Sequence, residues 1–185
     1  MKRSFLFLLP VLALASCSWF ESGSEQPLLS GVPAGCPQVA VIRDLSVYQN
    51  PPAANENSLV MTARMGNIRG GCMANSGGVN VDATMDVVAM KGARSNSTHA
   101  SIPFFVSVLD PHDDVVSKKV YEIPVDFENG ATETRVSTPI NPQFDIKPGD
   151  SGESYRVLIG FHLNPAQIDA NTRFFNGNVM RPAAP

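Results

Sequence analysis

Apolar and polar residues alternate along most of this chain after residue 36. The clearest run places an apolar residue at every second position, at Val79, Val81, Ala83, Met85, Val87 and Ala89. Because successive side chains of a β-strand point to opposite faces, this period of two predicts a strand with one buried face. Similar runs predict strands around residues 39–47, 59–65, 102–109, 121–125, 132–138 and 155–163. We therefore expect about seven strands.

Turn-forming residues separate these runs. The connections read Asn50-Pro51-Pro52, Asp110-Pro111-His112-Asp113-Asp114, Glu128-Asn129-Gly130 and Lys147-Pro148-Gly149-Asp150. The 15 prolines and 14 glycines of the chain oppose long helices. Two glycine pairs, Gly70-Gly71 and Gly77-Gly78, indicate a bulged hairpin loop around Cys72. The pattern favours an all-β, antiparallel sandwich of the immunoglobulin or fibronectin type III kind, with a small barrel as the alternative.

One short helix is expected near the end of the chain. Asn164 is a good N-cap residue, Pro165 suits the first helical position, and Gln167 stands where a capping box needs it. These residues predict a turn or two of helix through about Asn171, packed against one end of the sandwich.

The first 17 residues have the pattern of a bacterial lipoprotein signal. Lys2 and Arg3 precede an apolar run over residues 5–15, and Leu14-Ala15-Ser16-Cys17 matches the lipobox motif. The run is too short to span a membrane, which takes about 20 apolar residues. We expect cleavage after residue 16 and a lipid anchor on Cys17; an ordinary secretory signal is the alternative. Serine after the cysteine favours the outer membrane.

The rest of the chain divides by composition. Residues 17–35 are rich in Gly, Ser and Pro and indicate a lipidated tether. Residues 36–175 hold the strand pattern and predict one domain, which we expect to face the periplasm. Residues 176–185 indicate a flexible tail.

Two cysteines remain once Cys17 carries a lipid. Cys36 and Cys72 are an even pair in an oxidising compartment, which predicts a disulfide. Two free thiols or a metal site are the alternatives.

Charge limits the partners. The chain has a net charge of −3, and loss of Lys2 and Arg3 with the signal leaves −5, that is, −3 minus 2. An acidic chain without a basic run argues against nucleic acid as a partner.

Catalytic and cofactor motifs are sparse. No Gly-x-Ser-x-Gly motif or phosphate-binding glycine loop occurs, and no predicted strand displays a single acid inside an apolar stretch. We therefore expect a non-catalytic protein without a cofactor.

The densest set of metal-ligand residue types lies in one turn. It comprises Asp110, His112, Asp113 and Asp114. Carboxylates and an imidazole bind divalent ions, so this turn is a candidate weak metal site, although its spacing is also ordinary turn composition. His99 is expected in a solvated loop, and His162 is expected to be exposed or bonded at a sheet edge.

Four apolar side chains fall on the strand faces opposite the predicted core. They are Val88, Met90, Phe105 and Leu109. If they cluster, they predict a docking patch; otherwise they fill a sheet edge or lie under the helix.

Several sequence features resemble one protein family. They are Cys36-Pro37, Cys72, Ile102-Pro103-Phe104-Phe105-Val106, and the ending from Tyr155 to Ile168. They resemble a family of Gram-negative bacterial lipoproteins whose last strand reads Val-x-x-Gly-Phe-Gln-Leu before a Thr-Pro-Glu-Gln helix start. Here His162 replaces glutamine and Asn164 replaces threonine, which keeps the capping chemistry. The resemblance covers most of residues 36–175 and implies a sandwich on a lipid anchor, without an activity.

The sequence thus predicts a membrane-anchored envelope lipoprotein that acts as an interaction or scaffold module for another envelope protein. The alternative is a periplasmic lipoprotein that binds a small ligand or a metal ion through the loop around His112.

Overall fold

The computed structural model describes residues 35–52, 56–75, 77–128 and 130–176. The strands in this part of the chain are β1 (Gln38–Val41), β2 (Val47–Asn50), β3 (Met61–Asn75), β4 (Gly78–Lys91), β5 (His99–Leu109), β6 (Val115–Asp126), β7 (Glu133–Ile140), β8 (Gln143–Asp145) and β9 (Arg156–Phe161). The helices are the 3-10 turns η1 (Arg43–Leu45), η2 (Glu56–Ser58) and η3 (Gly152–Ser154), and α1 (Pro165–Phe175). The prediction of a mostly β chain with one short C-terminal helix is confirmed.

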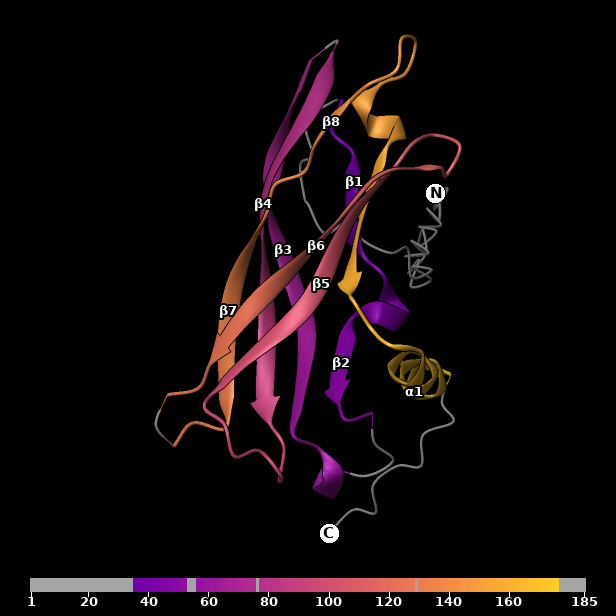
Figure 1. The fold of residues 1–185 in the computed structure, drawn as a ribbon. Helices are drawn as coiled ribbons and strands as arrows, with labels where there is room; N and C mark the ends of the chain where they lie inside the picture. Colours follow the sequence, from indigo (N-terminus) through magenta and orange to yellow (C-terminus); the bar gives the residue numbers. More distant parts are fainter. Residues whose placement is uncertain (1–34, 53–55, 76, 129, 177–185) are drawn as a thin grey trace, which may run out of the picture.

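The strands form two sheets. The first has the order β1-β9-β5-β6, and the second has the order β2-β3-β4-β7, with β8 also paired to β4. β1 runs parallel to β9, whereas the other pairs are antiparallel. Figure 1 shows the two sheets as two layers, with β5 and β6 crossing in front of β4 and β7.

The core lies between the sheets and contains the residues that the alternation singled out. One cluster joins buried side chains from both sheets, among them Val81, Met85, Val87, Ile102, Phe104, Ile159 and Phe161. Burial of such aliphatic and aromatic side chains contributes roughly 1.5–3 kcal/mol each, so this shared core is the main force holding the sheets together.

The predicted strand over residues 39–47 is two strands in different sheets. η1 interrupts the run, so that β1 lies beside β9 while β2 lies beside β3. At the crossing, the Ile42 N–H donates to the Ile159 carbonyl at 2.8 Å, and the Met65 N–H donates to the Ser46 carbonyl at 2.9 Å. This split, together with the short β8, is why the described residues hold more strands than the seven expected.

The β3–β4 hairpin is longer than predicted. The bulged loop expected around Cys72 is wrong, because strand pairing continues from Ile68 opposite Met85 to Asn75 opposite Gly78. The irregularity lies instead between Met65 and Ile68. At the tip, the Asn75 side chain accepts the N–H groups of Gly77 and Gly78 at 2.9 and 3.0 Å.

The helix begins as predicted and runs further. Asn164 and Gln167 form the capping box, with each side chain accepting the backbone N–H of the other. Gln167 also donates to the Gln49 carbonyl at 2.7 Å, and Asn171 donates to the carbonyls of Asp44 and Val47. These bonds hold α1 against η1 and β2, and the helix continues to Phe175 (Figure 1). Within the described ranges no helix is long and apolar enough to cross a membrane.

A disulfide joins the two layers. Cys36, just before β1, is bonded to Cys72 in β3, with 5.8 Å between their Cα atoms. The predictions for residues 1–16, for lipidated Cys17 with residues 17–34 of the tether, and for the tail 177–185 lie outside the described residues.

Candidate functional site

The turn that connects β5 to β6 was the candidate metal site, and hydrogen bonds within the turn organise it. Buried Asp110 accepts the backbone N–H groups of His112 and Asp114 at 2.9 and 3.1 Å through its Oδ1 atom. Asp113 has a φ of 70°, a left-handed conformation that aspartate tolerates better than most residues. The buried Asp110 carboxylate therefore stabilises the conformation of the turn.

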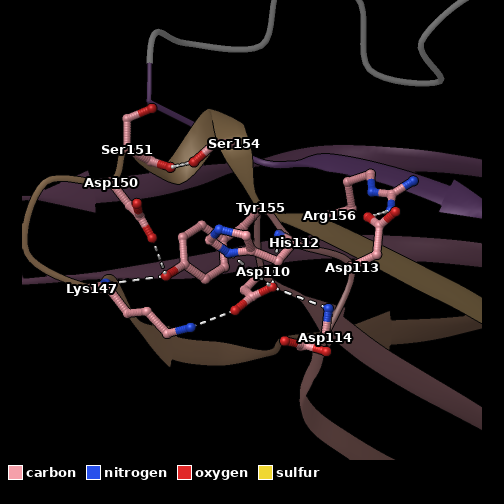
Figure 2. Close-up of polar contacts among 10 residues, drawn as sticks. All are labelled: Asp110, His112, Asp113, Asp114, Lys147, Asp150, Ser151, Ser154, Tyr155 and Arg156. Atoms are coloured by element: carbon pink, nitrogen blue, oxygen red, sulfur yellow. Dashed lines mark hydrogen bonds and ion pairs between the residues drawn. The ribbon is translucent and has the colours of Figure 1, made fainter.

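The second carboxylate oxygen of Asp110 contacts another part of the chain. Its Oδ2 atom accepts a hydrogen bond from the Lys147 ammonium at 2.5 Å. The backbone N–H of Lys147 donates to the hydroxyl of buried Tyr155, which donates in turn to Asp150; both distances are 3.1 Å. Figure 2 shows this chain of contacts, together with an ion pair between Arg156 and Asp113.

These contacts explain where the four candidate ligands lie. Lys147 and Arg156 neutralise Asp110 and Asp113, whereas the side chains of His112 and Asp114 are exposed (Figure 2). In the part of the chain that the structure describes, no three His, Cys, Asp or Glu side chains gather as metal ligands do. Asp110, Lys147, Asp150 and Tyr155 form a polar clamp between the β5–β6 turn and the segment that leads into β9, and the weak metal site at this turn stays a prediction.

Because the polar clamp contains an ion pair, we expect the folded protein to lose stability in acid. The hydrogen bond from Lys147 holds the pKa of Asp110 at about 2, below its ordinary value of 3.8. A group with a lowered folded-state pKa contributes stability that is present above the unfolded pKa and is lost as the pH falls from about 4 to about 2. We expect Asp110→Asn to lower the thermal unfolding midpoint by several degrees at pH 7 and by much less at pH 2.

Thermal unfolding followed by circular dichroism at a series of pH values checks this expectation. Exposed Asp114 is the matched control in the same turn, and Asp114→Asn should follow the wild-type curve. An Asp110→Asn protein that loses as much stability at pH 2 as at pH 7 would contradict the role of the ion pair.

The other two histidines lie at the surface. His162 is exposed, as one of the two expectations had it, and it follows β9. Its backbone N–H donates to the Pro103 carbonyl of β5 at 2.8 Å, between two interior strands of the sheet rather than at a sheet edge. His99 is exposed but belongs to the first position of β5 rather than to a loop, with its ring 2.5 Å from the Asp126 carboxylate.

A buried carboxylate on β4 was missed by sequence reasoning. Asp86 is only 5% exposed, although the alternation places it on the wet face. The Arg69 guanidinium binds it in a bidentate manner at 2.6 and 2.9 Å, and Ser137 donates at 2.9 Å. The Arg69 and Ser137 hydrogen bonds hold the pKa of Asp86 at about 2. The acid lies within the stretch Met85-Asp86-Val87, so the statement that no strand carries a single acid in an apolar stretch is wrong.

The predicted docking patch does not form. Phe105 and Leu109 belong to β5, whereas Val88 and Met90 belong to β4 in the other sheet. Phe105 is also buried, and the Lys118 ammonium lies 4.4 Å from its ring centroid. The four side chains therefore fall on two different outer faces.

Exposed apolar side chains gather instead on β6. Four of the eight large apolar side chains that are exposed in the described residues belong to this strand: Val115, Val116, Val120 and Tyr121. β6 is an edge strand, so it also presents unpaired backbone groups on one side. Sequence reasoning began this strand at Tyr121. The apolar residues on both sides of Lys118 and Lys119, directly after a turn, were the signal that it begins earlier.

A groove opens between the free edges of β6 and β7. It has a volume of about 440 Å³ and is lined by Phe104 and Tyr121 on one side and by Val136 and Ile140 on the other. The rings of Phe104 and Tyr121 stack with centroids 5.4 Å apart. Apolar side chains between the two sheets are therefore accessible at the β6–β7 side of the protein, next to the exposed strand β6. We call β6 and this groove the open edge.

Comparisons of the chain with protein-family models, with curated proteins and with solved structures returned no match.

Proposed function

We propose that this protein is a lipid-anchored lipoprotein of the bacterial outer membrane that acts as a non-catalytic interaction module. The observation that carries the proposal is the open edge, where an exposed strand with four apolar side chains borders an apolar groove. Proteins dock on such edges by adding a strand, since backbone hydrogen bonds supply affinity and side-chain pockets supply specificity. The partner docks on this edge within the envelope.

Sequence features support the anchor. The lipobox at Leu14-Ala15-Ser16-Cys17 would give the mature protein an acylated N-terminus, and the following residues would act as a tether. The domain would then face the periplasm, where Cys36 and Cys72 can stay oxidised. Immunoglobulin-like sandwiches commonly serve as interaction modules, and we propose that the two-layer fold is of this kind.

Photocrosslinking in intact cells tests the proposal. A crosslinking amino acid at Tyr121, on the open edge, should give one discrete product in the membrane fraction. The same amino acid at Met90, exposed on the other sheet, is the control and should give none. Cys17→Ala should release the protein from membranes and remove the product. A folded protein that gives no product from Tyr121, or the same product from Met90, would overturn the proposal.

The alternative function, binding of a small ligand, has one supporting observation. The volume of the groove falls within the range of ligand pockets, roughly 300–1,000 Å³. This observation adds the open edge as a second candidate ligand site beside the loop around His112.

A further inference from the structure

β6 lies at one end of its sheet, and the direction of its backbone groups follows from a single hydrogen bond on β5. The His162 N–H donates to the Pro103 carbonyl at 2.8 Å, so Pro103 directs its backbone toward β9. Because alternate residues of a strand direct their backbone groups to opposite edges, Phe104 directs its groups toward β6. The backbone groups of its partner Tyr121 therefore point toward β5. The backbone groups of the β6 residues on either side of Tyr121 point toward the free edge.

Three successive positions offer backbone groups to a new strand. Lys118, Val120 and Glu122 alternate with the residues paired to β5, so their N–H and C=O groups point outward from the sheet. Pro124, two residues after Glu122, has its backbone directed to the same free edge. Proline lacks an N–H, and edge strands accommodate it with the N–H side toward solvent. The available ladder is therefore short and ends at Pro124.

We propose that β6 pairs with β6 of a second copy of this chain, antiparallel and about a two-fold axis at Val120. This deepens the proposed function and rests on it, because lipid anchoring would bring copies together on one membrane surface. In this register Lys118 of each copy lies opposite Glu122 of the other, and the two opposite-charge pairs flank a central Val120–Val120 pair. Val120 is 49% exposed in the single chain, so pairing covers apolar surface.

Neighbouring registers are less favourable. When a two-fold axis extends the sheet into the second copy, each face of the sheet continues across the axis. The side chains of two residues directly opposite each other therefore lie on the same face. An axis at Lys118, Lys119 or Glu122 would place like charges opposite each other, which is destabilising. An axis at Tyr121 would place Pro124 opposite Lys118, nearer the centre, and would shorten the ladder.

The same residues restrict other pairings. Lysines, prolines and bulges are the features by which edge strands avoid uncontrolled association. β6 carries all three, because its register shifts where Leu109 lies opposite Val115. Lys118 therefore selects a register in which it meets Glu122 of the other copy, and the two lysines disfavour addition of a basic strand. This charge complementarity identifies the occupant of the edge as a second copy.

Disulfide trapping in intact cells tests the pairing in the full chain. Residues at a hydrogen-bonded antiparallel pair have Cα atoms about 5.5 Å apart, within the range for a disulfide. Val120→Cys should therefore give a disulfide-linked dimer on non-reducing gels. Met90→Cys is the matched control, because Met90 is also 49% exposed but lies on the other sheet, and it should stay monomeric.

Charge reversal tests the register. In the Val120→Cys background, Lys118→Glu alone or Glu122→Lys alone should reduce the dimer about tenfold, since each replaces two opposite-charge pairs with like-charge pairs. Both reversals together should restore it. Equal trapping from Met90→Cys, or a double reversal that fails to restore the dimer, would overturn the inference.

The two proposals fail separately. If Val120→Cys stays monomeric while the crosslinker at Tyr121 captures a different protein, the second copy is excluded and the interaction module stands. If a folded protein gives neither product, both proposals are excluded.

Discussion

Replacing Cys36 and Cys72 together by alanine is expected to lower the free energy of unfolding by about 4 kcal/mol. The two residues are 36 positions apart, and the bond between them removes the closure entropy of that loop from the unfolded chain. It also ties the start of β1 in one sheet to β3 in the other, so its loss frees the N-terminal strand of the domain. Urea unfolding of the purified protein measures the change.

Reduction supplies the control for this double variant. A reducing agent should lower the unfolding midpoint of the wild-type protein to that of the variant and should leave the variant unchanged. A wild-type midpoint that stays above the variant's after complete reduction would show that the alanines act by lost packing instead, since Cys36 is buried.

Gly70→Ala is expected to cost about 3 kcal/mol of folding free energy. Gly70 has a φ of +146°, which side-chain-bearing residues rarely adopt. A Cβ atom there would lie 2.2 Å from the Asp82 carbonyl oxygen and 2.5 Å from the Ala83 Cα, both in the adjacent strand β4. The backbone cannot yield without opening the β3–β4 ladder, so the free energy of unfolding in urea should fall.

Gly71 provides a matched control one residue away. A Cβ atom at Gly71 meets nothing within 4 Å, so Gly71→Ala should leave stability nearly unchanged. Equal losses from the two variants would show that general glycine flexibility, rather than the close approach of β3 to β4, sets the effect.

Local patterns predicted the parts of this fold that local chemistry determines. The alternation from Val79 to Ala89 identified the buried face of β4, and Asn164 with Gln167 identified the start of α1. In both cases the information lies within about ten consecutive residues, where side-chain direction and capping depend on near neighbours.

Features that depend on distant segments escaped prediction. Nothing near Arg43 indicates that the chain changes sheets there, because the change depends on β9 and β3 as partners. The sequence alone predicts that Asp86 faces solvent. Its burial depends on Arg69 in β3 and Ser137 in β7, which the fold brings to it. The groove likewise joins β6 to β7, so its lining could not be deduced from either strand alone.

The parallel pairing of β1 with β9 has a consequence for the order in which the domain is assembled. Gln38 lies opposite Arg156, a residue 118 positions later in the chain, so β1 can pair with β9 only after nearly the whole domain is present in the compartment where it folds. Sheet closure is therefore a late event, and contacts of this sequence separation are slow to form. Cys72 is only 36 positions after Cys36, so these two residues meet over a much shorter loop. A disulfide to Cys36 would hold the waiting strand beside β3 until the last strand arrives.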